Sequence, residues 1–384
     1  MRRMSKQAIG VFSLAYPPFI GGAEIALKEI ISRDPASDFV IFTKKFDRSW
    51  PTAESFDNCS ILRLGRGKVS PRSYYGGLFG KILYIFQAVR VAEKIHRERP
   101  FSAIWAVMAS YAGMAALIFK LRHPSVPLLL TLQEGDSESH ILRKVGIFYP
   151  FWKKIFKKAD HIQAISNFLA DFARRHGACC PIDVIPNGVD LEKYQSESSA
   201  KNKETTIFIT TSRLVHKNGV DVLIRSLPLL RATSYKLLIL GSGPEEQNLK
   251  NLASELGVAD KVDFLGHVEP DEVPSYLLQS TIFARASRSE GLGNSFLEAM
   301  AAGLPVIGTN VGGIPDFLRD GETGLFVKVD DPKDLAEKLD RLSRDRNLRE
   351  KLIANGKRLV SEKYTWDIIA AKMRNIFKKL CNEF

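Results

Sequence analysis

Cysteine and histidine are scarce in this chain, which has four cysteines and seven histidines among 384 residues. Neither residue type shows the spacing of a metal site, and two of the cysteines, Cys179 and Cys180, are adjacent. Adjacent cysteines are a poor basis for a disulfide framework. We therefore expect no bound metal, no disulfide scaffold and a reducing compartment.

Long runs of large apolar residues are also missing. The stretch Phe101–Phe119 carries no charge, but it is rich in Ala, Ser and Gly. A buried strand at Ser102–Val107 and a helix at Gly113–Phe119 fit it better than a membrane span. The apolar run Ala8–Ala15 resembles a signal peptide, yet it ends in two prolines and is typical of a first core strand. We expect a cytoplasmic protein that can lie on the inner face of the membrane.

Acidic residues are under-represented in the first half of the chain. The formal net charge is +12, and residues 1–190 account for +11 of it. A basic half beside a nearly neutral half suggests that the first half meets an anionic partner. Nucleic acid, a phospholipid surface and a phosphorylated glycan all satisfy this pattern. No nucleic-acid-binding module is recognisable, so we expect no nucleic acid.

Short apolar runs alternate with amphipathic stretches along the whole chain. This alternation predicts parallel strands joined by crossover helices, that is, doubly wound α/β domains. The expected strands are Ile9–Leu14, Phe39–Thr43, Ser60–Leu64, Ala103–Val107, Leu128–Leu132, His161–Ile165, Ile182–Ile185, Ile207–Thr210, Lys236–Leu240, Val262–Leu265, Ile282–Ala284, Val306–Thr309 and Leu325–Val327. The expected helices include Ala23–Ile31 and Leu78–Ile95.

A polar stretch, Ser196–Thr205, interrupts this alternation and indicates a nearby domain boundary. We expect a first Rossmann-like domain over residues 1–186 and a second over residues 187–365. Residues 366–384 are predicted to form a helix that packs back on the first domain, because apolar residues recur at helical spacing over Trp366–Leu380.

Three loops that follow expected strands have the residues of an anion or sugar site. Gly21 and Gly22 open a helix, where backbone N–H groups and the helix dipole favour an anion. Arg213 and Lys217 lie four residues apart and can hold a diphosphate. Each of these two signals alone is weak, because glycine turns and solvated charges are common.

The third loop carries the strongest signal. Glu290 lies in a glycine-rich turn, and Glu298 follows about two helical turns later. Two glutamates at this spacing are common by chance. Here they stand within Ser289-Glu290-Gly291-Leu292-Gly293-Asn294-Ser295-Phe296-Leu297-Glu298-Ala299-Met300-Ala301-Ala302-Gly303-Leu304-Pro305.

Residues 285–327 closely resemble the signature of the family 4 retaining glycosyltransferases of the GT-B fold. The matching motifs also include Val311-Gly312-Gly313-Ile314-Pro315-Asp316, Gly321-Glu322-Thr323-Gly324-Leu325, Gly21-Gly22-Ala23-Glu24, Ile185-Pro186-Asn187-Gly188-Val189-Asp190, Ser212-Arg213-Leu214 with Lys217, and Gly241-Ser242-Gly243-Pro244. The resemblance implies two Rossmann-like domains facing each other across a cleft. It also implies an acceptor-binding first domain and a donor-binding second domain.

The resemblance implies a hexosyltransferase that takes a nucleoside-diphosphate sugar as co-substrate and needs neither metal nor cofactor. Arg213 and Lys217 would bind the donor diphosphate, and Glu298 would hold the ribose. Glu290 would contact the donor sugar, together with the backbone of Gly291, Leu292, Gly293 and Asn294. Gly21 and Gly22 would lie against the phosphates from the opposite domain.

One departure concerns the acceptor side. The family commonly has a histidine in a Thr-x-His pattern after the strand that corresponds to Leu128–Leu132, and this chain has Gln133 there. Glutamine can donate a hydrogen bond but cannot exchange a proton. We therefore expect Gln133 to position substrate, with activation of the acceptor left to the donor phosphate.

Two other functions remain open from the sequence. A nucleotide-sugar epimerase has a similar fold, although the context of Glu290 and Glu298 argues against it. A non-catalytic subunit could have kept the donor site and lost turnover, as Gln133 suggests. The preferred interpretation is a retaining transferase that acts on a glycan or lipid-linked acceptor in polysaccharide or glycolipid assembly.

Two stretches raise the possibility of membrane contact. In Ile147–Lys158, aromatic and aliphatic residues occupy one side of a helical wheel and four lysines the other, which suits an interfacial helix. The alternative is that this aromatic side faces the domain core. In Arg63–Lys81, basic residues alternate with aromatic ones and predict an exposed basic loop.

Overall fold

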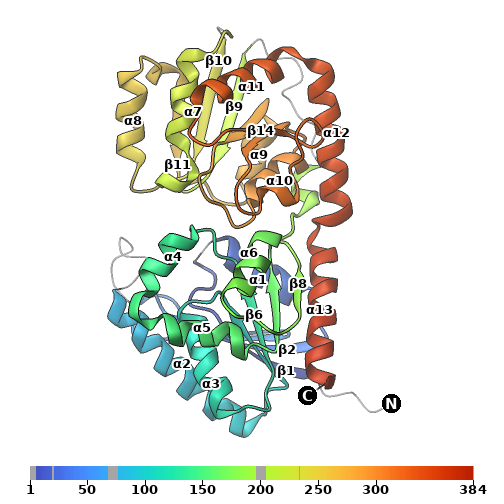
Figure 1. Ribbon diagram of the computed structural model, residues 1–384. Helices are drawn as coiled ribbons and strands as arrows, with labels where there is room; N and C mark the ends of the chain where they lie inside the picture. The colour runs from blue at the N-terminus through green and yellow to red at the C-terminus, as the bar shows by residue number, and fades with distance from the viewer. Residues whose placement is uncertain (1–5, 20, 68–76, 196–204, 233, 384) are drawn as a thin grey trace. The chain divides into compact units, whose positions relative to one another are not determined.

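The computed structural model describes residues 6–19, 21–67, 77–195, 205–232 and 234–383, and Figure 1 labels the helices and strands of each unit. The chain forms two compact units. The first comprises Met1–Glu134, Glu138–Pro186 and Trp366–Phe384, and the second comprises Gly135–Ser137 and Asn187–Thr365. Residues 196–204 of the expected connection lie outside the described residues.

The first unit is built on a sheet with the strand order β3-β4-β2-β1-β5-β6-β7-β8. All neighbouring strands are parallel except β3, which runs antiparallel to β4 at the edge. The strands are β1 (Gln7–Phe12), β2 (Ser37–Lys44), β3 (Ala53–Phe56), β4 (Cys59–Leu64), β5 (Ala103–Val107), β6 (Leu128–Leu132), β7 (His161–Ala164) and β8 (Ile182–Val184). The helices are α1 (Gly22–Ser32), α2 (Leu78–Glu98), α3 (Tyr111–Arg122), α4 (Glu138–Val145), α5 (Tyr149–Lys158), α6 (Asn167–Arg175) and α13 (Trp366–Glu383).

The second unit contains a parallel sheet with the order β11-β10-β9-β12-β13-β14. The strands are β9 (Thr206–Thr211), β10 (Tyr235–Leu240), β11 (Val262–Gly266), β12 (Ile282–Arg285), β13 (Val306–Thr309) and β14 (Leu325–Val327). The helices are α7 (Val220–Ser226), α8 (Glu246–Glu255), α9 (Val273–Leu278), α10 (Asn294–Ala301), α11 (Pro332–Arg344) and α12 (Arg346–Lys363). Both units therefore confirm the predicted doubly wound α/β fold class.

Helix α13 completes the core of the first unit. Its apolar side packs against β1, β2, β5 and α1, so that the last helix of the chain lies in the same core as its first strand. The ring of Phe377 contacts Phe39 of β2 and Trp105 of β5. Apolar burial of this extent is the main stabilising contribution to a domain.

The uncharged stretch Phe101–Phe119 forms β5 and most of α3, in agreement with the expected strand and helix. Among the described residues, no helix combines the length and apolar character needed to cross a bilayer.

The aromatic side of α5 faces the interior of the first unit. Trp152 and Phe156 are buried against Phe172 of α6, and the Trp152 indole donates a hydrogen bond to the carbonyl of Ala109 at 2.5 Å. The prediction of an interfacial helix over Ile147–Lys158 is therefore wrong for these residues, and the core alternative is correct. Ile147 and Phe148, which precede α5, are exposed.

The predicted exposed basic loop over Arg63–Lys81 is also wrong at its first residue. Arg63 lies within β4, where its guanidinium is buried and paired with Glu54. It also donates a hydrogen bond to the carbonyl of Pro17 at 2.8 Å. Arg66 is exposed, whereas Lys68, Arg72, Tyr74 and Tyr75 lie outside the described residues.

Candidate functional site

The candidate site residues of the second unit lie at the carboxyl ends of adjacent strands. Strands β9 and β12 pair in parallel at the centre of the sheet. The loop after β9 carries Arg213 and Lys217, and the loop after β12 carries Glu290. Parallel strands end at the same edge of a sheet, which is where α/β folds bind ligands. Arg213 and Lys217, which are far from Glu290 in the sequence, therefore lie with it on loops at the same edge of the sheet.

A buried amide links these two loops. Asn218 donates a hydrogen bond to the carbonyl of Arg213 at 2.6 Å and accepts one from the guanidinium of Arg285 at 2.9 Å. Arg285 also donates to the hydroxyl of Ser295 at 2.9 Å and forms an ion pair with Glu290. The network fixes the loop after β9, the end of β12 and the first turn of α10 relative to one another.

The carboxylate of Glu290 is held on both oxygens. One oxygen is paired with Arg285, and the other accepts the N–H of Gly291 at 3.1 Å. The carbonyl of Glu290 accepts the N–H of Gly313 at 3.3 Å. Gly312 has a φ of 56°, and a Cβ there would overlap that same carbonyl. The glycine pair of the Val311-Gly312-Gly313 motif thus supports the turn that presents Glu290.

The loop that carries Arg213 is braced from β10. Gly241 has a φ of 134°, and a Cβ there would overlap the carbonyl of Ser212. The N–H of Leu214 donates to the carbonyl of Ser242 at 3.0 Å. These contacts fix the backbone on both sides of Arg213, whose side chain is exposed.

Lys217 is held by two residues that the sequence argument did not identify. Its ammonium pairs with the carboxylate of Asp136 at 2.9 Å, within the second unit. Arg288 fixes the backbone of the same loop. Its backbone N–H donates a hydrogen bond to the carbonyl of Lys217 at 2.7 Å, and its guanidinium donates one to the carbonyl of His216 at 2.6 Å. Arg288 is itself paired with Asp221 at 2.7 Å.

Glu298 lies on α10 and is half-buried. Burial is the largest influence on its carboxyl and raises the pKa above its ordinary value, whereas the charges of Lys193 and Arg285 lower it. The charge of Glu298 also contributes to the raised pKa of Tyr194. Hydrogen bonds from hydroxyl groups stabilise the charged form of a carboxylate that has lost water, and a diol can supply two of them.

The candidates Gly21, Gly22 and Gln133 belong to the first unit. Gly21 caps the N-terminus of α1, with the carboxylate of Glu24 close to it. The N–H of Gln133 donates to Glu134 at 2.9 Å. The second oxygen of Glu134 accepts the N–H of Ala109 at 2.7 Å, which joins the loops after β5 and β6. Glu134 therefore fixes the backbone that presents Gln133.

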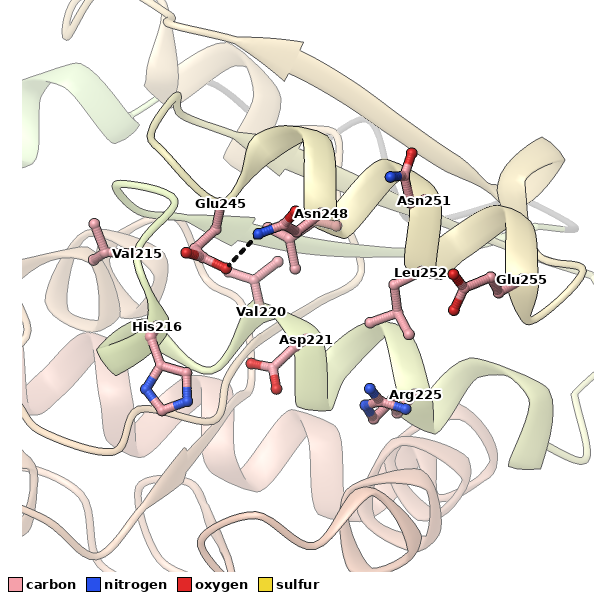
Figure 2. Close-up of a pocket in the computed structure, with 11 residues that line it drawn as sticks. Val215, His216, Val220, Asp221, Arg225, Glu245, Asn248, Asn251, Leu252 and Glu255 are labelled. Atoms are coloured by element: carbon pink, nitrogen blue, oxygen red, sulfur yellow. Dashed lines mark hydrogen bonds between the residues drawn. The ribbon is translucent and has the colours of Figure 1, made fainter.

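A separate cavity of about 320 Å³ lies between α7, α8 and the loop before α7 (Figure 2). Its walls include the carboxylates of Asp221, Glu245 and Glu255, and Asn248 donates a hydrogen bond to Glu245 at 3.2 Å. None of the predicted site residues lines it. With three carboxylates beside one guanidinium, that of Arg225, the wall disfavours a diphosphate, so the strand-end network remains the candidate site. Among the described residues, no three Cys, His, Asp or Glu side chains gather as a metal site would require.

Comparison with known families gives two matches that adjoin along the chain. The model of "Glycosyltransferase Family 4" matches residues 20–193, and that of "Glycosyl transferases group 1" matches residues 192–359. These ranges include both the glycine loop at Gly21-Gly22 and the network around Glu290.

One curated relative is the GDP-mannose-dependent alpha-(1-6)-phosphatidylinositol monomannoside mannosyltransferase of Mycobacterium tuberculosis. It is 28% identical over 381 residues, covering 94% of this chain and 96% of the relative. Among solved structures, sucrose-phosphate synthase of Thermosynechococcus elongatus matches with a TM-score of 0.85, at 21% identity, over 99% of this chain and 100% of that one. The Anabaena protein HepE, solved with UDP and glucose, matches with a TM-score of 0.77, at 18% identity, over 97% and 100%. At these identities the structural likeness shows a shared fold.

Proposed function

The chain belongs to glycosyltransferase family 4 and has the GT-B fold, and on this premise we propose that it transfers a hexose, with retained anomeric configuration, from a nucleoside-diphosphate sugar to a lipid-linked or glycan acceptor. The likeness to a relative named for GDP-mannose and a phosphatidylinositol mannoside favours a GDP-mannose-type donor and a lipid-linked acceptor. The product would enter cell-surface polysaccharide or glycolipid assembly. The reaction would take place at the cytoplasmic face of an anionic membrane.

The observation that carries this proposal is the hydrogen-bonded network at the ends of β9 and β12. It holds Glu290, the start of α10 and the backbone of Arg213 in fixed positions. In the proposal, Arg213 and Lys217 neutralise the leaving diphosphate without a metal ion, as preorganised cations do. Glu298 accepts hydrogen bonds from the ribose hydroxyls. Glu290 and the backbone of residues 291–294 hold the donor sugar.

The chemistry that we propose breaks the bond between the anomeric carbon and the diphosphate oxygen. The acceptor oxygen forms a new bond to that carbon on the same face, and its proton passes to the departing phosphate oxygen. Glu290 is a poor candidate for a covalent nucleophile, because Arg285 and the N–H of Gly291 engage its two oxygens. Gln133 would position the acceptor, and Gly21 and Gly22 would lie against the donor phosphates.

The test is a transfer assay with a panel of nucleotide sugars and a membrane-lipid extract. We expect GDP-mannose to raise the melting temperature and to label a lipid, since a ligand stabilises the state that it binds. The anomeric configuration of the product, read by NMR, tests retention. Activity that survives chelation of divalent cations supports the metal-independent step, and activity that is lost with EDTA and restored by a metal contradicts it.

The diphosphate role is tested by Arg213→Ala and Lys217→Ala. We expect kcat/KM to fall about 100-fold or more in each variant, because transition-state charge stabilisation is lost. Exposed Lys236, which pairs with Asp263 on the second unit, provides the matched control as Lys236→Ala. Unchanged kinetics in both site variants would show that these cations do not hold the leaving group.

A further inference from the structure

The first nine residues of α2 present an exposed apolar face. The exposed fractions are 66% for Leu78, 79% for Phe79, 42% for Ile82, 41% for Leu83 and 63% for Phe86. These positions recur at helical spacing, so they lie on one side of the helix. Tyr84 and Ala88, on the other side, are buried in the first unit. We call the five exposed residues the α2 face.

Two further apolar side chains are exposed in the turn between α4 and α5. Ile147 is 89% exposed and Phe148 65% exposed. Burial lowers the pKa of Lys81 on α2, and the nearby ammonium of Lys144 on α4 lowers it further. The end of α4 therefore lies close to the beginning of α2.

Carboxylates are missing from both segments. Residues 77–92 contain Lys81 and Arg90 but neither Asp nor Glu. Residues 139–159 contain six lysines and arginines and again no acid. Arg143 and Lys144 are exposed. Like charges gathered beside apolar side chains favour a partner that is anionic at its surface and apolar beneath it.

We propose that the α2 face, together with Ile147 and Phe148, docks the first unit on an anionic phospholipid membrane, with Lys81, Arg143 and Lys144 at the level of the phosphate groups. This inference rests on the proposed function and identifies the surface that brings the enzyme to a lipid-linked acceptor. It places the contact on α2 and the turn before α5, because the aromatic residues of α5 itself lie in the core. A protein partner would need acidic side chains arranged beside an apolar strip. An anionic bilayer offers a charged phosphate layer above apolar acyl chains over its whole surface.

Co-sedimentation of the full chain with vesicles tests the docking surface. We compare phosphatidylcholine vesicles with vesicles that also contain phosphatidylglycerol. The test variant combines Phe79→Ser with Phe86→Ser. The matched control is Phe56→Ser, since Phe56 is 65% exposed on the edge strand of the same unit.

We expect the parent and the Phe56→Ser control to bind only the anionic vesicles, and added salt to weaken this binding. The double variant should bind at least about tenfold more weakly, because both aromatic rings of the α2 face are lost. Exchange of Lys144 for Glu should also weaken binding. Melting temperature and nucleoside-diphosphate binding should stay unchanged in every variant, which separates this surface from the donor site.

Equal sedimentation of the double variant and the parent would overturn the proposal, and so would equal binding to neutral and anionic vesicles. Light scattering adds a further check. A parent dimer that the double variant dissociates, without any lipid binding, would show that a second copy of the chain covers the α2 face and would likewise overturn it. Loss of transfer with intact vesicle binding would instead contradict the proposed function alone.

Discussion

At the scale of single residues, the pairing of Lys217 with Asp136 stands out, because a cation proposed for the donor diphosphate is already neutralised by a carboxylate. Both side chains are about one-third exposed, so the pair is worth at most about 1 kcal/mol. A diphosphate carries more charge than one carboxylate and can displace it. Asp136 would then act as a weak competitor for the donor.

Replacement of Asp136 by Asn should therefore tighten binding of a nucleoside diphosphate, by up to about fivefold if the ~1 kcal/mol of the pair is released. Isothermal titration with GDP measures this directly. Asp263→Asn is the control, since Asp263 pairs with Lys236 on the sheet at 3.0 Å. Weaker binding in the Asp136 variant would mean that this carboxylate helps to hold the donor.

The half-buried carboxyl of Glu298 gives a pH-dependent prediction. Its pKa is raised above the ordinary value of 4.5, so the folded state keeps this proton more tightly than the unfolded state does. Stability is therefore lost as the pH rises from the unfolded pKa through the folded one. Glu298→Gln should raise the melting temperature relative to the parent at about pH 7 and much less at about pH 4.

The same variant should bind a nucleoside diphosphate more weakly, because an amide accepts fewer hydrogen bonds from ribose than a carboxylate. Glu255→Gln on exposed α8 is the control for both measurements. A variant that is less stable than the parent at neutral pH would show that Lys193 and Arg285 outweigh the desolvation of Glu298.

The site residues that could not be predicted from the sequence, such as Arg285 and Asn218, were missed for the same physical reason. Arg213, Lys217 and Glu290 stand within motifs and were named from them, although no observation tests their roles. Arg285 and Asn218 are 67 residues apart and meet only because β9 and β12 are neighbours in the sheet. This strand order depends on the packing of the whole sheet, so neither local segment alone predicts it.

At the scale of elements, apolar runs located most strands well. Strands β5, β6, β13 and β14 have the predicted bounds. Strand β3 was missed because it lies at the edge of its sheet with mostly exposed residues and has no apolar run. For α5, the helical wheel correctly showed an aromatic and a basic side. It could not show that Phe172 of α6 and His176, directly after α6, would cover the aromatic side.

Truncation of Trp152 tests this packing. Trp152→Ala should lower the free energy of unfolding by about 3–5 kcal/mol, because a large buried ring is removed and the bond to Ala109 is lost. Phe148→Ala, four residues earlier and exposed, should change it by less than about 0.5 kcal/mol. Urea denaturation followed by tryptophan-independent circular dichroism measures both. Equal effects would place the aromatic side of α5 outside the core.

At the scale of the whole molecule, the chain completes its first unit with its last helix. A chain that ends at Thr365 would lack the α13 side chains that cover β1, β2 and α1. We expect such a chain to lose amide protection in the first sheet and to keep it in β9–β14, whose core contains no residue of α13. Hydrogen exchange resolves the two sheets. Full protection of β1 and β2 in the shortened chain would show that α13 is dispensable for the first unit.

The return of the chain through α13 also sets an order of events on the ribosome. The first unit is the first to be synthesised, yet its core stays open until Trp366 and the residues after it have emerged. The second unit, Asn187–Thr365, is made in the interval, which lasts roughly ten seconds or more at about 5–20 residues per second. The unit whose strands are synthesised before the second unit is therefore the one that finishes folding last. During that interval the apolar side of its sheet, which α13 later covers, has no such cover.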